Sequence, residues 1–437
     1  MTTVILCEKP SVAADLARLL GTKQKHSGYY TLLNGDIVTH ARGHLFELAN
    51  PKSYNEAWGG TWRWDLLPML PEVFKLQTAY KKEDMVKLLK TLIKNASKVV
   101  IATDAGREGE LIARDILAQC KYKGPVERFW TSDSTDEGML KAYRSLRSGK
   151  STEALYEAAA ARRKADWMLG LSGTRAVTLA ANVSRTAFPI GRVQTPVLGM
   201  VVQRCEDVKN FKSSAYYELE AEVHTSKGEE FKMWHKPAKG EDRITDESVA
   251  KALLAQAAGA DGVLKVTTTP SKESPPLLYS LPVLQQDANR VLGLSAKNTL
   301  EVAQQLYEKK AISYPRTDSQ HLGQSHKAEV SETVRMIERN FKEGVAVLDS
   351  QGIMLRDSTF DDSKLSDHHG IIPSRQFVQL TGIELQVFTF ICQRYLQAMA
   401  QDHRYDQTLV SLDANGVPFK ASGRVITRMG WKEIKLI

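Results

Sequence analysis

The chain has 437 residues, which predicts about two to four domains, and its 42% hydrophobic and 25% charged residues are typical of a globular protein without a membrane-spanning run. Fifty-nine Lys and Arg against 51 Asp and Glu leave a net charge of +8, which permits a polyanionic partner such as nucleic acid. The four cysteines are far apart and the N-terminus lacks a signal-peptide pattern, so we expect no zinc ribbon or disulfide framework, and a cytoplasmic location.

The first part of the chain alternates strand and helix. An apolar strand at Val4–Cys7 is followed by a helix that opens at Ser11 and stops at Gly21. The same order recurs with a helix at Met85–Ile93, a buried strand at Val99–Ala102 and a helix from about Glu108 to Leu117. This alternation predicts a mostly parallel sheet, which places ligands at the carboxyl ends of its strands.

The pattern then changes from helical to extended. Residues from Thr152 to about Arg204 are helical in composition, whereas Tyr217–Val223 alternates with a period of two and predicts a half-buried strand. We expect Val263–Val266 to pair with that strand, and the polar segment Pro270–Pro276 to be a stiff linker and hinge. The remaining predicted elements are helical segments at Leu281–Tyr307 and Lys327–Phe341 with Tyr314 in the loop between them, and a hairpin of Leu409–Leu412 and Phe419–Ile426 around Asn415-Gly416.

Three carboxylates follow the second predicted strand directly: Asp104, Glu108 and Glu110. Like charges so close together repel, so solvent, Arg107 or a bound cation must neutralise them, and hard oxygen ligands suit Mg²⁺. The alternative is a solvated loop in which the glycines supply the turn.

Glu8 and Lys9 follow the first predicted strand. If the two strands are neighbours, this acid and amine project into the same crevice as Asp104. A carboxyl group there can pass a proton to a leaving oxygen, and a lysine can stabilise phosphate charge. The same residues are also typical of a plain helix start, with Pro10 in the first turn and Ser11 as the cap.

Two further motifs carry candidate chemistry. A phenol is a poor nucleophile at its usual pKa of about 10, and Arg316 can supply Tyr314 with a nearby cation that also grips a phosphate oxygen. The alternative for Tyr314-Pro315 is packing or turn formation. His368 and His369 suggest a metal, but without a third His or Cys at a usable spacing, phosphate binding or proton relay is the favoured role.

These four motifs, in this order, resemble the type IA DNA topoisomerases, with the overall pattern most similar to bacterial and plasmid topoisomerase III. The resemblance extends along essentially all of the chain. Three more stretches support it: Gly43-His44-Leu45, Gly191–Pro196 and Leu284–Ala288. The sequences Gly191–Pro196 and Ser313–Ser319 are highly specific to that family, whereas Gly43-His44-Leu45 is not.

The resemblance implies a multidomain α/β protein with a toroid-like type IA core. Its expected parts are a Toprim (Rossmann-like) domain at 1–150, a helical gate-base and single-strand groove domain at 151–212, a β-strand arch at 213–275, a mobile helical domain with the catalytic tyrosine at 276–395, and a return to the arch at 396–437. It also implies a C-terminally incomplete core, because the chain stops just past Gly430-Trp431, where family members return to complete the gate base.

The resemblance further implies an enzyme that breaks one DNA strand through a 5′-phosphotyrosine link, passes a strand and religates without ATP. Such an enzyme relaxes negative supercoils or decatenates DNA. The implied roles are Tyr314 as nucleophile, Glu8 as acid for the leaving 3′ oxygen, Lys9 and Arg316 as phosphate-stabilising cations, His368 as the residue positioning the scissile phosphate, Asp104, Glu108 and Glu8 as the Mg²⁺ site, and Arg192, Gln194, Thr195, Arg162 and Asp166 as groove residues that bind DNA.

The chain departs from the family at Gly106, where many members have Asp, so we expect one Mg²⁺ rather than two. The expected partner is single-stranded or negatively supercoiled DNA, with no membrane, and we expect a monomer. The competing hypothesis is a truncated relative that grips single strands without turnover. A Toprim nuclease or primase is disfavoured, because neither needs the motifs around Tyr314 and Arg192.

Overall fold

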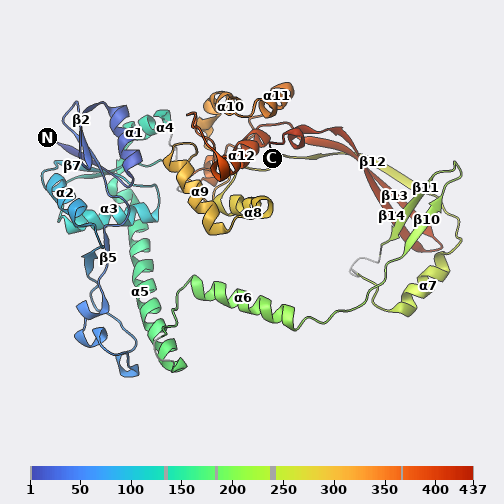
Figure 1. Cartoon of the computed structure of the whole chain (residues 1–437), viewed down its shortest axis with the longest axis horizontal. Coiled ribbons are helices and arrows are strands. Elements are labelled where there is room, and N and C mark those ends of the chain that lie inside the picture. The colour runs from blue at the N-terminus through green and yellow to red at the C-terminus, as the bar shows by residue number, and fades with distance from the viewer. Residues whose placement is uncertain (1, 132–135, 183–185, 237–242, 366–367, 437) are drawn as a thin grey trace. The chain divides into compact units, whose positions relative to one another are not determined.

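The computed structural model describes residues 2–131, 136–182, 186–236, 243–365 and 368–436 (Figure 1). The chain divides into two compact units, of which the first holds Met1–Asp207, Gly323–His326 and Asp362–His369. The second holds Val208–Leu322, Lys327–Asp361 and Gly370–Ile437. The second unit begins at Val208, close to the predicted domain boundary after residue 212. The division into five parts stays a prediction. In the described part of the chain, every helix is too short or too polar to cross a membrane.

The first unit is built on a mixed sheet whose four inner strands are parallel. Within the described residues the sheet has seven strands in the order β2-β3-β4-β1-β7-β8-β9, in which β4, β1, β7 and β8 are parallel neighbours and the other pairs are antiparallel. Its strands are β1 (Thr3–Cys7), β2 (Thr22–His26), β3 (Tyr29–Leu32), β4 (Ile37–His40), β7 (Lys98–Ala102), β8 (Val126–Arg128) and β9 (Arg147–Ser148).

Helices cover both faces of this sheet because side chains of its central strands alternate between two apolar clusters. Ile5 and Cys7 pack with α1 (Pro10–Leu20) and α4 (Asp136–Arg144) on one face. Val4 and Leu6 pack with α2 (Glu83–Lys94) and α3 (Arg107–Gln119) on the other. The predicted strands and helices of this region are confirmed.

The start of α1 differs in detail from the helix start considered above. Lys9 is the N-cap residue without a capping side-chain hydrogen bond, and Pro10 occupies the first turn, so Ser11 lies inside the helix and is not the cap. The fixed backbone angle of proline suits the first turn of a helix, so the helix begins at Pro10, one residue before the predicted start at Ser11. Gly21 ends the helix in the left-handed conformation, with φ 88°, as predicted.

A long helix, α5 (Glu153–Ala181), supports an insertion between β4 and α2 (Figure 1). Trp167 Nε1 donates to Ala49 O at 3.1 Å, and Arg175 Nη2 donates to Trp58 O at 2.8 Å. The insertion contains β5 (Phe46–Leu48), η1 (Pro51–Ser53), η2 (Glu56–Gly59), η3 (Trp64–Leu66) and β6 (Leu76–Thr78). The predicted helical region is confirmed as η4 (Gly149–Thr152), α5 and α6 (Gln194–Lys209). The left-handed Asn182 caps the end of α5, and residues 186–193 lie outside the helices.

An antiparallel sheet forms one part of the second unit. In the described part of the chain its order is β10-β11-β14-β13-β12, with α7 (Glu247–Ala257) packed against it. The strands are β10 (Glu220–His224), β11 (Glu230–His235), β12 (Lys265–Glu273), β13 (His403–Ala414) and β14 (Val417–Arg428). The predicted hairpin is confirmed, because Asn415 and Gly416 turn the chain between β13 and β14 with φ of 53° and 84°.

Two expectations for this sheet are wrong. The segment containing Val263–Val266 does not pair with β10, because β12 and β10 lie at opposite edges and the β13–β14 hairpin fills the centre. The predicted hinge Pro270–Pro276 is also mostly strand, since Pro270 lies in β12 opposite Asp406. Proline is tolerated there because β12 is an edge strand, where one side of the backbone needs no ladder hydrogen bond.

Helices form the rest of the second unit around its largest apolar cluster. The predicted segment Leu281–Tyr307 is two helices, since Gly293 ends the first in the left-handed conformation with φ 67°. Tyr314 lies in the loop after the second, as predicted. The helices are α8 (Leu281–Leu292), α9 (Ala296–Glu308), α10 (Val330–Glu338), α11 (Lys342–Gln351) and α12 (Gly382–Ala398), with short turns η5 (Gln324–Glu329), η6 (Asp362–Lys364) and η7 (Gly430–Glu433) elsewhere in the chain.

Candidate active site

Acidic and basic side chains meet at the carboxyl ends of β1 and β7. The strands are parallel neighbours with Cys7 opposite Ala102, so Glu8, Lys9 and Asp104 leave the sheet at one edge. Lys9 Nζ lies 2.7 Å from Asp104 Oδ2, and the backbone N–H of Asp104 donates to Glu8 Oε2 at 3.4 Å. The predicted meeting of these residues is therefore confirmed.

His368 joins this cluster. Its segment, Asp362–His369, belongs to the first unit, and His368 Nε2 lies 3.2 Å from Asp104 Oδ2. His369 is buried with its ring edge-on to His326, at 4.7 Å between ring centroids. The two histidines therefore have different environments, and His368 is the one at the acidic crevice.

The two carboxyl groups in the crevice differ in their affinity for protons. Burial alone would raise the pKa of Asp104, but the hydrogen bond from His368 and the charge of Lys9 outweigh it and lower that pKa to about 2. Burial and the charge of Asp104 raise the pKa of Glu8. Asp104 is thus a fixed negative charge, and Glu8 is the group more easily protonated, as a general acid requires.

Glu108, the third predicted metal ligand, is largely exposed and pairs with His44. Its side chain is 65% exposed, with Oε2 3.6 Å from His44 Nε2. No group of three or more His, Cys, Asp or Glu among the described residues is arranged to hold a metal ion. The set of Glu8, Asp104 and Glu108 stays a prediction. Its chemistry fits a hard divalent cation, because Glu8 and Asp104 are adjacent carboxyl groups whose repulsion such an ion relieves.

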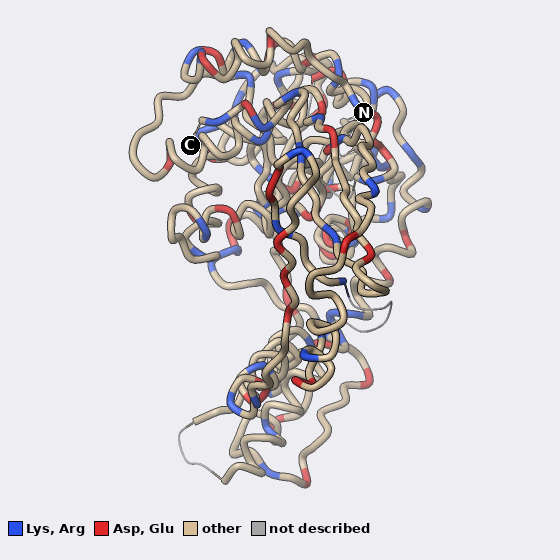
Figure 2. The backbone as a smooth tube through the Cα atoms, turned by 90° about the vertical axis from the view of Figure 1, so that its right-hand side faces the viewer, with Lys and Arg blue, Asp and Glu red and all other residues tan. Residues whose placement is uncertain are grey.

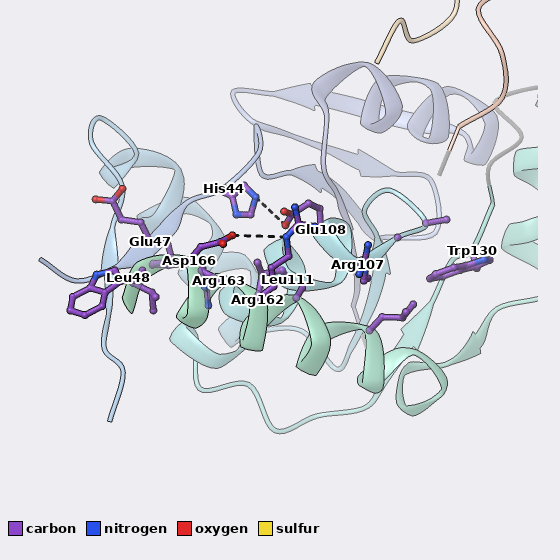
Figure 3. A pocket seen from close by; sticks show the side chains of 16 residues that line it. His44, Glu47, Leu48, Arg107, Glu108, Leu111, Trp130, Arg162, Arg163 and Asp166 are labelled. Carbon is purple, nitrogen blue, oxygen red and sulfur yellow. Dashed lines mark ion pairs between the residues drawn. The ribbon is translucent and has the colours of Figure 1, made fainter. Parts of the chain in front are cut away.

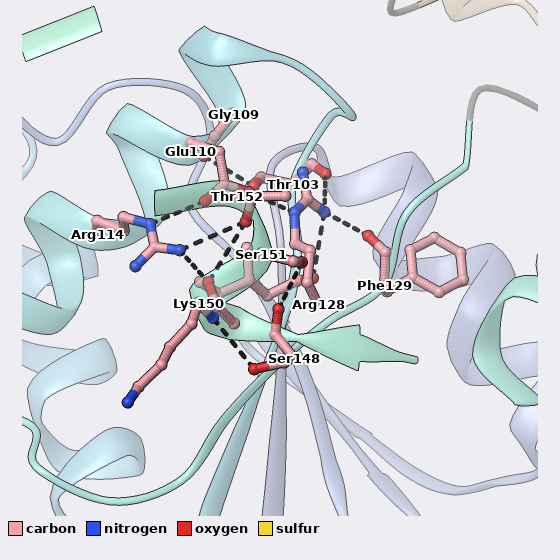
Figure 4. Close-up of polar contacts among 12 residues, drawn as sticks. Thr103, Gly109, Glu110, Arg114, Arg128, Phe129, Ser148, Lys150, Ser151 and Thr152 are labelled. Atoms are coloured by element: carbon pink, nitrogen blue, oxygen red, sulfur yellow. Dashed lines mark hydrogen bonds and ion pairs between the residues drawn. The ribbon is translucent and has the colours of Figure 1, made fainter. Parts of the chain in front are cut away.

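Glu110 does not face the crevice, contrary to the expectation of three crowded carboxylates. It is fully buried, accepting from Arg128 Nε at 2.5 Å and from Arg114 Nε at 2.8 Å (Figure 4). Because α3 begins directly after Gly106, its first two residues, Arg107 and Glu108, are exposed, whereas the next two, Gly109 and Glu110, are buried. The sequence analysis missed Arg128 altogether, since nothing around Val126–Arg128 suggests a buried charge.

A groove of about 910 Å³ runs beside Glu108, between α3, β5 and α5 (Figure 3). Two predicted DNA-binding residues, Arg162 and Asp166, line it. Arg192 donates to Asp166 from Nε at 2.8 Å and from Nη2 at 3.3 Å. Lining residues that the sequence analysis did not assign are His44, Arg107, Trp130, Arg163 and Trp167.

The other two predicted groove residues begin α6. Thr195 Oγ1 accepts from Gly191 N at 3.0 Å, and the backbone N–H of Thr195 donates to Gly191 O at 3.1 Å. Thr195 thereby fixes the turn that carries Arg192. Gln194 is the first residue of the helix, and its contact with DNA stays a prediction.

Tyr314 belongs to the second unit and is half-buried. Its ring lies edge-on to that of Tyr307, with 5.3 Å between centroids. The loop is fastened on both sides of Tyr314: Ser313 N donates to Ile372 O at 2.9 Å, and Leu281 N donates to Thr317 O at 2.9 Å. The next cation along the loop, Arg316, is exposed. The phenol and the guanidinium are therefore presented by an ordered turn.

Family models match almost the whole chain. A DNA topoisomerase family matches residues 150–436, and a Toprim domain matches residues 3–133. The chain belongs to the type IA DNA topoisomerase family, and its first unit contains a Toprim domain, a metal-binding class of domain.

Among individual proteins, the chain resembles topoisomerase III. It is 37% identical to DNA topoisomerase 3 of Bacillus licheniformis and 36% identical to that of Bacillus subtilis, over 442 residues in each case. These matches cover 99% of the chain and 59% of each relative, so the chain spans about three fifths of their length. Full-length topoisomerase I from Thermotoga maritima has a similar fold, with a TM-score of 0.64, 22% identity, and coverage of 99% of this chain and 67% of that one.

Proposed function

We propose that the chain cleaves and reseals single-stranded DNA through a covalent bond to Tyr314, and so relaxes negative supercoils or decatenates DNA without ATP. The observation that carries the proposal is the cluster of Lys9, Asp104 and His368 beside Glu8 at the end of the parallel sheet. Family membership and the ordered loop of Tyr314 support it.

In the proposed reaction the phenolic oxygen of Tyr314, having lost its proton to solvent, forms a bond to the scissile phosphorus. The bond from phosphorus to the 3′ oxygen breaks, and Glu8 donates a proton to that oxygen. Lys9 and Arg316 stabilise the charge on the phosphate, and His368 positions it. Attack by the free 3′ hydroxyl on the phosphotyrosine reverses the step, which conserves the bond energy and explains why no ATP is needed.

We propose Mg²⁺ as the metal, held by Asp104 and Glu8 with Glu108 as a third ligand. A hard divalent cation there supplies positive charge near the phosphate and offsets the two adjacent carboxyl groups. The groove lined by Arg162 and Asp166 is proposed to hold the single strand, with Arg192, Gln194 and Thr195 at its border. We also propose a monomeric cytoplasmic protein, which light scattering and cell fractionation test.

Trapping of the covalent link tests the nucleophile. The protein is incubated with an oligonucleotide labelled on the 3′ side of the cleavage site, denatured, and examined for label that migrates with protein. Tyr314→Phe is expected to abolish the adduct, because phenylalanine has no oxygen to attack phosphorus. Tyr307→Phe is the matched control, since its ring adjoins that of Tyr314, and it is expected to keep the adduct.

Two outcomes contradict the proposal. An adduct that persists in Tyr314→Phe assigns the nucleophile to another residue. Salt-sensitive binding of single strands by the unmodified chain, with no adduct at any Mg²⁺ concentration, identifies a binding protein without turnover.

A further inference from the structure

We propose that Arg128 is a positioning residue for the cleavage reaction. Its guanidinium holds the backbone of Asp104 from the protein interior, and Glu110 orients that guanidinium. The inference rests on the proposed function for its catalytic consequence. Its structural part stands on the contacts of Arg128 and Glu110.

Arg128 ends β8 and is fully buried. Its Nη1 donates to Thr103 O at 2.8 Å, to Ile101 O at 3.2 Å and also to Phe129 O, while Nη2 donates to Asp104 O at 2.7 Å (Figure 4). Nε donates to Glu110 Oε1 at 2.5 Å. One planar group thus holds the carbonyl oxygens of two successive residues, Thr103 and Asp104, at the turn out of β7.

This arrangement is costly if stability is its only purpose. Two buried charges lose their hydration, and well-packed apolar residues often stabilise a core as much as a buried ion pair does. A guanidinium offers what apolar residues and lysine lack, namely several N–H donors in a fixed plane. These donors bind the backbone of the turn that carries Asp104. The carboxylate of Asp104 in turn contacts Lys9 and His368.

Glu110 extends the same network to the groove helix. Its second oxygen, Oε2, accepts from Arg114 Nε at 2.8 Å. Arg114 Nη2 in turn donates to Gly149 O at 2.5 Å and to Thr152 Oγ1 at 3.4 Å, directly before α5 begins at Glu153. One buried carboxylate therefore links the turn of Asp104 to the start of the helix that carries Arg162 and Asp166.

Hydrogen exchange on the full chain tests the structural part without reference to activity. Two amides in the turn depend on its shape, because Gly106 N donates to Asp104 O at 2.8 Å and Glu110 N donates to Gly106 O at 3.1 Å. In Arg128→Lys, peptides covering residues 103–110 are expected to exchange about tenfold faster or more, since lysine keeps the charge and loses the planar donors.

Arg356→Lys is the matched control. Arg356 also bridges a carboxylate and a backbone carbonyl, with Nη2 3.0 Å from Asp402 Oδ1 and Nη1 3.3 Å from Ala398 O, but in the second unit. It is expected to leave exchange at residues 103–110 unchanged. Unchanged exchange there in Arg128→Lys, or equal acceleration in both variants, overturns the proposal.

Single-turnover cleavage separates positioning from folding. With saturating oligonucleotide, Arg128→Lys is expected to lower the rate constant for adduct formation by about tenfold or more while the Kd for the oligonucleotide stays within about threefold. Arg356→Lys is expected to keep the rate. A loss that appears only as weaker binding, or that Arg356→Lys shares at an equal fall in Tm, contradicts a positioning role.

Glu110→Gln provides a second variant should Arg128→Lys fail to fold, because it keeps the shape of the side chain and removes its charge. It is expected to accelerate exchange both at residues 103–110 and at residues 149–153, where Arg114 loses its partner. Faster exchange in only one of these two segments contradicts the proposal that Glu110 connects the turn of Asp104 to the start of α5. If the unmodified chain forms no adduct, the proposed function and the catalytic part of this proposal fail, and the exchange results still test whether Arg128 holds the turn of Asp104.

Discussion

Gly109 lies where α3 passes closest to the backbone of Asp104. A methyl group at this position would collide with the carbonyl oxygen of Asp104, and Thr103 Oγ1 donates to Gly109 O at 2.8 Å across the same gap. The turn that presents Asp104 is thus packed against backbone rather than against a side chain that can move aside. A glycine in a helix usually costs stability, and here it permits the close approach.

Gly109→Ala is therefore expected to destabilise the chain by about 1 to 3 kcal/mol and to reduce adduct formation, because the turn must shift. Gly199→Ala is the control: Gly199 lies in α6 with no atom near the added methyl group, and this change is expected to be neutral or stabilising by up to about 1 kcal/mol. Thermal unfolding and adduct yield measure both. Equal stability of the two variants would show that the collision is relieved cheaply.

Gly106 is the other glycine of interest at this turn, because the resemblance to the family implies that an Asp at this position would be a further metal ligand. Its backbone is extended, with φ −163° and ψ −179°, which any residue adopts. Gly106→Asp is expected to add a carboxylate ligand and tighten Mg²⁺ binding, seen by calorimetry as a lower Kd and in cleavage as a lower Mg²⁺ requirement. Gly106→Asn, which adds similar bulk without charge, is expected to have a smaller effect. Equal effects of the two variants would rule out an electrostatic cause.

Some helices and strands can be predicted from the local sequence pattern, whereas the position of others depends on pairing with residues far away in the sequence. Continuous apolar runs predicted β1 and β7, and their neighbouring positions brought Glu8 and Asp104 together as expected. Local pattern could not predict the partner of β12, because any strand with a period of two can pair with several others. It also assigned Glu110 to the crevice, since its partner Arg128 lies 18 residues further on in an unremarkable strand.

The long hairpin of β13 and β14 supplies a test at the scale of an element. Gly416→Ala is expected to destabilise the chain by about 1 to 2 kcal/mol, because φ at this position is 84° and a side chain is strained there. Gly423→Ala lies in β14 with open space around the added methyl group and is expected to cost nothing or to stabilise slightly. Urea unfolding measures both. A Gly416→Ala variant as stable as the parent would show that the turn has relaxed to another type.

Over the whole molecule, the net charge of +8 is not confined to one segment. Figure 2 shows Lys and Arg along much of the chain, interspersed with Asp and Glu. A general attraction for polyanions therefore accompanies any specific contact in the groove. The contribution of an individual groove residue can be measured from the salt dependence of binding, because each phosphate contact releases counterions.

In Tyr314→Phe, the logarithm of the affinity for a single strand is expected to fall linearly with the logarithm of salt concentration. Adding Arg162→Gln is expected to reduce the steepness of that line by about 0.7, the value for one lost phosphate contact on a single strand. Arg18→Gln is the control, since Arg18 lies on α1 in an exposed ion pair with Asp136 and does not line the groove. Fluorescence anisotropy gives the slopes. An unchanged slope for Arg162→Gln would remove this residue from the DNA contacts.

The first unit completes its crevice with residues from a distant part of the chain, since His368 meets Asp104. During synthesis, the parallel sheet can form as soon as its own strands have left the ribosome. The histidine follows only after most of the chain, including β12 and the loop of Tyr314, has been translated. A nascent chain can thus fold its Toprim sheet early, while the cluster around Asp104 stays incomplete until His368 has been translated.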